Sequence, residues 1–113
     1  MKEGDIVLIP LPQADGKLKL RPALALRQMP PFNDFLVCGV SSQLHQQVKS
    51  FDEILYMNDT DFKQCGLLQP SLVRLGFLAV IPTKSIAGNI GRIASDRHKR
   101  LLKNLSEYLS KEN

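Results

Sequence analysis

The chain has 113 residues, which is enough for one modest hydrophobic core, and we expect a single domain over residues 1–113. Its net charge of +4 suits a polyanionic partner without requiring one. The absence of Trp and an aromatic content of only 6% argue against a protein that binds single-stranded nucleic acid mainly by stacking bases on rings. No segment approaches membrane-spanning length and no signal-peptide pattern opens the chain, so we expect a cytoplasmic protein.

Most of the chain is predicted to form short β-strands. Runs of β-branched and apolar residues predict strands at 5–11, 21–27, 35–42, 51–57, 71–75, 77–81 and 86–93. The third of these is apolar on both faces, which indicates a central position in a sheet. Polar segments with turn-forming residues predict loops at 13–20, 28–34 and 43–50.

Two helical segments are predicted. Residues 58–64 favour a short helical turn that ends at Gly66. A longer helix is predicted to begin at Ser95, a suitable N-cap, with Asp96 in its first turn. An apolar stripe on this helix is expected to belong to the core: Leu101, Leu102, Leu105, Tyr108 and Leu109. The other side is basic, and we expect it to be solvated: Lys99, Arg100, Lys103 and Lys111.

Many short strands followed by one helix predict a mainly β, barrel-like fold with a C-terminal α-helix, although the pattern leaves the topology open. Cys38 lies in an apolar run and is predicted to be buried, and a disulfide to Cys65 stays open as an alternative. The two cysteines and two histidines are too scattered to indicate a metal site, so we expect neither a metal nor a cofactor. His98 is expected to be structural.

Four short motifs occur in an order typical of one protein family. They are Gly-Asp-Ile-Val at 4–7, Arg-Pro-Ala-Leu at 21–24, Val-Ser-Ser-Gln at 40–43 and Ser-Leu-Val-Arg at 71–74. Together with Lys-Ser-Ile at 84–86 and Gly-Arg-Ile at 91–93, they resemble the MazF/PemK (Kid-like) toxins over nearly the whole chain.

The resemblance implies an SH3-like barrel with a C-terminal helix, assembled as a homodimer. It also implies a sequence-specific endoribonuclease toxin that cleaves single-stranded RNA without a metal or cofactor and is neutralised by an acidic antitoxin protein.

Such cleavage uses the 2′-hydroxyl of the RNA as the nucleophile, so the enzyme must stabilise charge on phosphorus and assist proton transfer. Arg21 is the predicted catalytic cation, because its planar fork can hold two phosphate oxygens. By resemblance, Arg21 also donates a hydrogen bond or proton to the leaving 5′-oxygen. Ser41 stands where the family has a catalytic threonine, and its hydroxyl could instead merely end a strand in a turn.

Five further residues are predicted to bind RNA. Ser42 and Gln43 would donate hydrogen bonds to phosphate or base, and Lys17 and Lys19 would attract the RNA at long range. Arg74 matches an arginine used by the PemK/Kid branch; the alternative is that it pairs with Asp52 or Glu53 within the protein.

The general base is not identified by the sequence. The PemK/Kid branch places an aspartate two residues after its arginine, and this chain has Gly76 there. Histidine is the side chain most often suited to act as a base near neutrality, but His45 lies in no supporting motif, and a surface position is expected. Two alternatives follow: an enzyme based on Arg21 and Ser41, or a catalytically weakened relative that binds RNA or protein without cutting. A gyrase poison of the CcdB type is disfavoured, because the chain lacks the Trp-Gly-Ile ending of that group.

Overall fold

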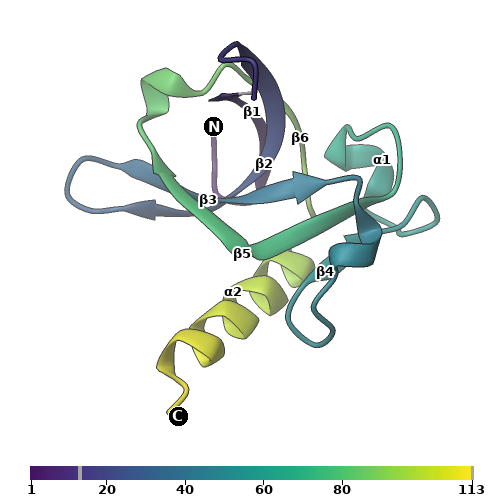
Figure 1. Cartoon of the computed structure of the whole chain (residues 1–113). Coiled ribbons are helices and arrows are strands. Elements are labelled where there is room, and N and C mark those ends of the chain that lie inside the picture. The colour runs from purple at the N-terminus through teal and green to yellow at the C-terminus, as the bar shows by residue number, and fades with distance from the viewer. Residues whose placement is uncertain (13, 113) are drawn as a thin grey trace.

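The computed structural model describes residues 1–12 and 14–112. Six strands form one antiparallel sheet: β1 (Asp5–Pro12), β2 (Leu18–Met29), β3 (Asp34–Ser41), β4 (Glu53–Leu55), β5 (Ser71–Ile81) and β6 (Gly88–Arg92). The strands lie in the order β4-β5-β3-β2-β1-β6. The sheet curls into a half-barrel, and the C-terminal helix lies along one side of it (Figure 1). The mainly β, barrel-like fold with a C-terminal helix is therefore confirmed.

The helical elements are short except for the last. They are α1 (Phe62–Cys65), α2 (Ser95–Ser110) and the 3-10 turns η1 (Leu44–Gln46) and η2 (Thr83–Ser85). Helix α1 ends as predicted at Gly66, whose φ of 76° is a left-handed conformation that glycine adopts without strain. No helix among the described residues is long and apolar enough to cross a membrane.

Alternating side chains of the sheet supply two apolar clusters. Ile6 and Leu24 are paired across β1 and β2 and belong to the cluster that also contains Leu101 of α2. At the neighbouring pair of the ladder, Val7 and Ala23 belong to the second cluster. Successive side chains of a strand point to opposite faces, so both faces of the central strands are covered. This agrees with the central position of β3, between β5 and β2.

Several predicted boundaries differ from the structure. The predicted strands 51–57 and 86–93 are shorter, as β4 (Glu53–Leu55) and β6 (Gly88–Arg92), and the predicted helical turn 58–64 is α1 (Phe62–Cys65). Strand β2 already begins at Leu18, inside the predicted loop 13–20, because Leu18 pairs with Pro12 of β1. Strands β2 and β3 also extend into the predicted loop 28–34, leaving a short hairpin connection. The segments 71–75 and 77–81 are one strand, β5, which passes through Gly76 with an irregularity in its pairing to β3.

The structure of α2 differs from the sequence prediction near both ends of the helix. Ser95 is the first helical residue and Ala94 occupies the N-cap position, whose backbone N–H donates to a carboxylate oxygen of Asp61 at 3.0 Å. The predicted core stripe stops early, because Tyr108 and Leu109 are 60% and 69% exposed. Figure 1 shows the reason: the C-terminal end of α2 extends beyond the sheet.

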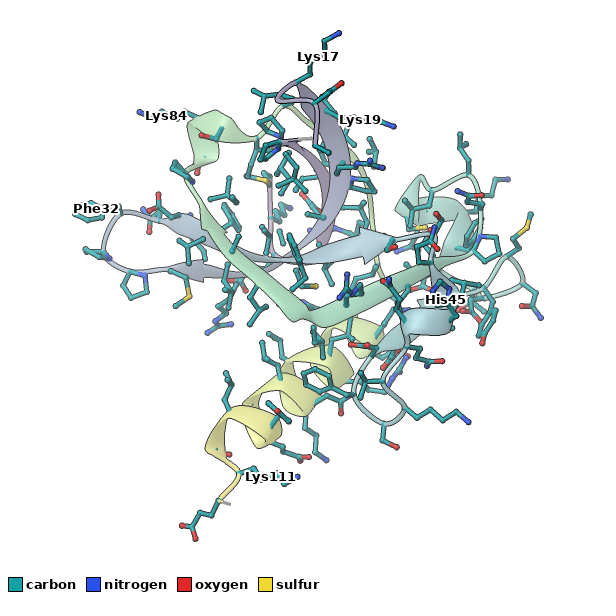
Figure 2. All side chains as sticks on the ribbon, in the orientation of Figure 1. Lys17, Lys19, Phe32, His45, Lys84 and Lys111 are labelled. Atoms are coloured by element: carbon teal, nitrogen blue, oxygen red, sulfur yellow. The ribbon has the colours of Figure 1, made fainter. Side chains whose placement is uncertain are left out.

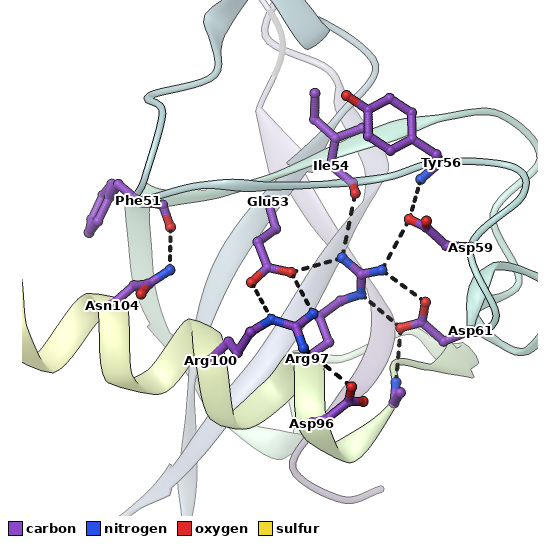
Figure 3. A network of polar contacts seen from close by, with 11 residues as sticks. Phe51, Glu53, Ile54, Tyr56, Asp59, Asp61, Asp96, Arg97, Arg100 and Asn104 are labelled. Atoms are coloured by element: carbon purple, nitrogen blue, oxygen red, sulfur yellow. Dashed lines mark hydrogen bonds and ion pairs between the residues drawn. The ribbon is translucent and has the colours of Figure 1, made fainter.

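A buried arginine in α2 is the main feature that the sequence analysis missed. The guanidinium of Arg97 contacts the carboxylates of Glu53, Asp59 and Asp61 at 2.8–3.1 Å (Figure 3). Burial alone would raise the pKa of Asp61, but hydrogen bonds from Arg97 and from a backbone N–H outweigh it and hold the pKa below its ordinary value. Arg100 also pairs with Glu53, so the basic side of α2 is only partly a solvated face. This network fastens α2 to β4 and to the segment before α1.

Cys38 and His98, which were expected to be structural, are buried or internally bonded, and Cys65 is buried as well. Cys38 and Cys65 are both buried and free, which rules out the alternative of a disulfide between them. Burial raises the pKa of the Cys38 thiol to about 12, so the thiol stays protonated. Nε2 of His98 lies 2.8 Å from the carbonyl oxygen of Leu26, which ties α2 to β2.

Candidate functional site

A cleft of about 680 Å³ opens beside the ends of β2 and β3. Five of the seven predicted site residues line it: Arg21, Ser41, Ser42, Gln43 and Arg74. Lys17 and Lys19 do not belong to its lining; they lie near the tip of the β1–β2 hairpin (Figure 2). The two lysines therefore lie outside the cleft, where a long-range electrostatic role remains open to them.

The cleft exists because β2 and β3 separate at this end. The last residue pair of their ladder is Ala23 with Gly39. Beyond that pair, the two strands no longer pair with each other. Arg21 pairs with Ile9 of β1, and Ser41 pairs with Leu72 of β5. Residues two positions apart in a strand share a face, so Arg21 lies on the face of Ala23 and Ser41 on the face of Gly39. The two predicted catalytic side chains thus lie on the same face of the sheet, on opposite sides of the gap between the strands.

Ser41 ends β3 in a tight turn. Its Oγ accepts a hydrogen bond from the backbone N–H of Gln43 at 3.0 Å. The structural alternative for Ser41 is therefore present in the molecule. A hydroxyl has one proton and two lone pairs, so accepting this bond leaves the proton of Ser41 available to a ligand in the cleft.

Arg74 adds a second guanidinium to the cleft. It is half-buried in β5, where it pairs with Gly39 of β3. The alternative that Arg74 pairs with Asp52 or Glu53 is wrong: both carboxylates have other partners, and none of the ion pairs among the described residues includes Arg74. Two arginines at one concave site make it attractive to a phosphate group.

An irregularity in β5 shapes the wall that carries Arg74. Gly39 pairs with Arg74, but the preceding residue of β3, Cys38, pairs with Leu78. Residues 75–77 consequently have no partner in β3, which is a bulge that redirects side chains. One of them, Phe77, lines the cleft although the sequence analysis assigned it no role.

Asp52 stabilises this bulge, a role that the sequence analysis did not predict for it. Its Oδ1 accepts the backbone N–H of Leu75 at 3.0 Å, which replaces a ladder bond lost at the bulge. Its Oδ2 accepts the N–H of Val48 at 2.9 Å, in the loop that follows Gln43. One buried carboxylate thus connects the loop after Ser41 to the strand that carries Arg74. The sequence offers no local signal for this contact, because its partners are 4 and 23 residues away.

The described lining of the cleft contains no Asp, Glu, His, Lys, Cys or Tyr. Gly76 is exposed and does not restore the carboxylate that the PemK/Kid branch has there. His45 lies exposed on η1 and outside this lining, so the structure does not bring it to the cleft (Figure 2). Within the described ranges, no three His, Cys, Asp or Glu residues are grouped so that they could hold a metal ion.

Comparison with known proteins identifies what the chain resembles as a whole. Residues 2–109 match the family model of the PemK-like, MazF-like toxin of type II toxin-antitoxin systems. Among solved structures, the Mycobacterium tuberculosis toxin MazF-mt6 is similar with a TM-score of 0.68 at 19% identity, over 96% of this chain and 99% of that one. At this identity the likeness establishes the fold. A comparison with curated proteins gave no match.

Proposed function

The chain belongs to the PemK-like, MazF-like toxins of type II toxin–antitoxin systems, and on this basis we propose that it is a sequence-specific endoribonuclease of the cytoplasm. Its substrate is single-stranded RNA. The observation that carries the proposal is the position of Arg21 and Ser41 on one face of the sheet, across the gap between the diverging ends of β2 and β3.

The reaction is an internal transfer at phosphorus that needs no metal. The 2′-oxygen of one nucleotide attacks the adjacent phosphorus and the bond to the 5′-oxygen breaks, which gives a 2′,3′-cyclic phosphate and a 5′-hydroxyl. Arg21 and Arg74 hold the non-bridging oxygens and stabilise the charge that grows on them. The hydroxyl of Ser41 donates to one of these oxygens, and Ser42 and Gln43 donate from the exposed rim. Arg21 also donates a hydrogen bond to the departing 5′-oxygen, which takes its proton from water to become the 5′-hydroxyl.

Removal of the 2′-proton is assigned to solvent. The described lining of the cleft has no side chain with an ordinary pKa near neutrality, and an arginine stays protonated, so it has no lone pair that could accept a proton. Hydroxide from the solvent therefore takes the proton, and the protein contributes charge stabilisation and positioning.

A second candidate function is a weakened relative that binds RNA or a protein partner without cutting it. Two observations favour it: Gly76 stands in place of the branch's aspartate, and the hydroxyl of Ser41 is already engaged in a turn with Gln43. RNA binding without product after long incubation would support this candidate.

The partners proposed are an acidic antitoxin and a second copy of the chain. A cleft with two arginines suits acidic side chains as well as phosphate. Exposed apolar residues support the homodimer: Leu78 and Val80 pair with Cys38 and Leu36, so they lie on the face of the sheet that packs against α2, yet they are 39% and 55% exposed. A second copy could cover them together with the exposed end of α2.

The deciding experiment is cleavage of single-stranded RNA by the purified protein in the presence of a chelator. The proposal expects defined products with 5′-hydroxyl ends, and it expects Arg21→Ala to reduce cleavage by at least about 100-fold, the typical effect of removing a donor to a developing oxyanion. Arg27→Ala is the matched control, because Arg27 is exposed on the same strand and pairs with Glu3 outside the cleft. Full activity of a folded Arg21→Ala protein would refute the proposal.

A further inference from the structure

Phe77 is held in the bulge of β5 beside a residue without a side chain. A Cβ built on Gly39 would lie 3.1 Å from Cδ1 of the Phe77 ring and 3.4 Å from its Cγ. The separation of 3.1 Å is tighter than ordinary van der Waals contact, so a side chain at position 39 would push against the ring. Gly39 therefore provides the space in which the ring rests on the backbone of β3.

Part of the Phe77 side chain is open to solvent. Phe77 is 41% exposed and lines the cleft. Most of the chain's other phenylalanines are wholly or partly covered: Phe35 and Phe62 are buried, and Phe51 is half-buried. Phe32 is the other exposed one, and it lies at the tip of the β2–β3 hairpin, away from the cleft lining (Figure 2). An aromatic ring supported on one side and exposed on the other is suited to stack against a flat ligand group.

The neighbours of Phe77 in the cleft indicate what that group is. Gly39, on which the ring rests, is the ladder partner of Arg74. Arg74 and Arg21 line the same cleft and suit a phosphate. In single-stranded RNA a phosphate is flanked by bases that are free to unstack, and such bases commonly stack on aromatic side chains.

We propose that Phe77 is the platform on which one base next to the phosphate held by Arg21 and Arg74 stacks. This inference rests on the proposed function, because it assumes that the cleft holds single-stranded RNA. It makes Phe77 a binding residue that orients the RNA, while the charge stabilisation remains with the arginines. The bulge of β5 and the absence of a side chain at Gly39 are the features that present the ring.

The test compares two probes that share a backbone and differ in their bases. One is a set of 2′-O-methyl 8-mers of A, U, C and G, whose blocked 2′-oxygen cannot attack. The other is an 8-mer of the same sugar phosphates in which every nucleotide is abasic. The wild type is expected to bind at least one base-containing 8-mer more tightly than the abasic one. Phe77→Ala should weaken that binding by about 5- to 150-fold, the value of one stacked base, and leave the Kd of the abasic probe unchanged.

Three further variants separate stacking from structure. Phe77→Trp should retain the preference for bases because it restores an aromatic face. Phe77→Leu keeps apolar contact with Gly39 without a π face, so it should fold and still lose the preference, even if Phe77→Ala fails to fold. Phe32→Ala should bind both probes as the wild type does.

The outcomes distinguish this inference from the proposed function. If the wild type cleaves RNA and binds the 8-mers, but Phe77→Leu keeps the full preference for bases, the stacking role is refuted and the nuclease stands. If Phe77→Leu weakens binding of the abasic probe equally, the residue is merely structural and the inference is again refuted. If the wild type neither cleaves RNA nor binds any 8-mer, both proposals fail together.

Discussion

Asp52 and Leu75 are joined by a hydrogen bond of 3.0 Å from the backbone N–H of Leu75 to Oδ1 of the buried carboxylate. The bond occurs where β5 has lost its regular pairing with β3, so it satisfies a donor that would otherwise be buried without a partner. The other oxygen of Asp52 accepts from Val48. The shape of the cleft wall therefore depends on an acidic residue that is not part of the cleft.

Replacing Asp52 by Ala is expected to destabilise the protein and to impair the cleft. The change leaves the N–H of Leu75 buried without an acceptor, at a cost of about 1–3 kcal/mol in the free energy of unfolding. The bulge that follows Arg74 then loses its support, so RNA binding should weaken beyond what partial unfolding explains. Urea denaturation and binding of a 2′-O-methyl 8-mer at low temperature measure the two effects.

Asp15→Ala is the control for that variant. Asp15 also accepts a backbone N–H, from Lys17, but in an exposed loop. Stability and RNA affinity should stay close to the wild type, since exposed backbone groups can bond to water instead. Equal behaviour of the two variants would contradict the role given to Asp52.

The catalytic role proposed for the Ser41 hydroxyl can be tested by removing the hydroxyl and by keeping it on a stiffer side chain. Ser41→Ala removes the proposed donor to the non-bridging oxygen and should lower kcat by about 100- to 1,000-fold. Ser41→Thr keeps the hydroxyl and restricts its rotamers, so activity should equal or exceed that of the wild type. Single-turnover cleavage at saturating enzyme measures the chemical step. A Ser41→Ala protein that cleaves at the wild-type rate would show that Ser41 has only a structural role, in the turn with Gln43.

The strands and the C-terminal helix could be predicted from the sequence because their signals are local. β-branched runs and an apolar stripe are read within a few residues of one another. Arg21, Ser41 and Arg74 were named as site residues by motif resemblance. The motifs do not explain why these three residues line one cleft. Their meeting depends on the point where β2 and β3 stop pairing after Ala23 and Gly39, and no local pattern specifies that point.

The residues that the sequence analysis missed act through distant partners. Arg97 looks like any basic residue of an amphipathic helix, yet three carboxylates from segments 36 to 44 residues away surround it. Phe77 looks like a core residue of a strand, and only the bulge places it in the cleft. The predicted buried stripe of α2 was too long, because it extended to Leu109, which is exposed. Helix periodicity does not reveal where the sheet beneath the helix ends.

Acid is expected to weaken the attachment of α2 through Asp61. Its pKa in the folded protein lies below the ordinary value of 3.8, so its stabilisation is complete above that value and is lost as the pH falls through the lower folded pKa. The free energy of unfolding should therefore decrease below about pH 4. Asp61→Asn should flatten this acid limb. Asp96→Asn, which changes an exposed carboxylate of α2, should leave it unchanged. Urea denaturation between pH 2.5 and 6 measures the slope.

The pH dependence of cleavage tests the assignment of proton removal to solvent. If hydroxide takes the 2′-proton and no side chain in the cleft titrates near neutrality, the logarithm of the single-turnover rate should rise linearly with pH, with a slope of about one between pH 6 and 9. His45→Ala should follow the same line, because His45 lies outside the described lining of the cleft. A bell-shaped profile, or a plateau that His45→Ala removes, would show that a side chain serves as the base. The rates must be taken from the chemical step, since slow product release would flatten the line without any titrating group.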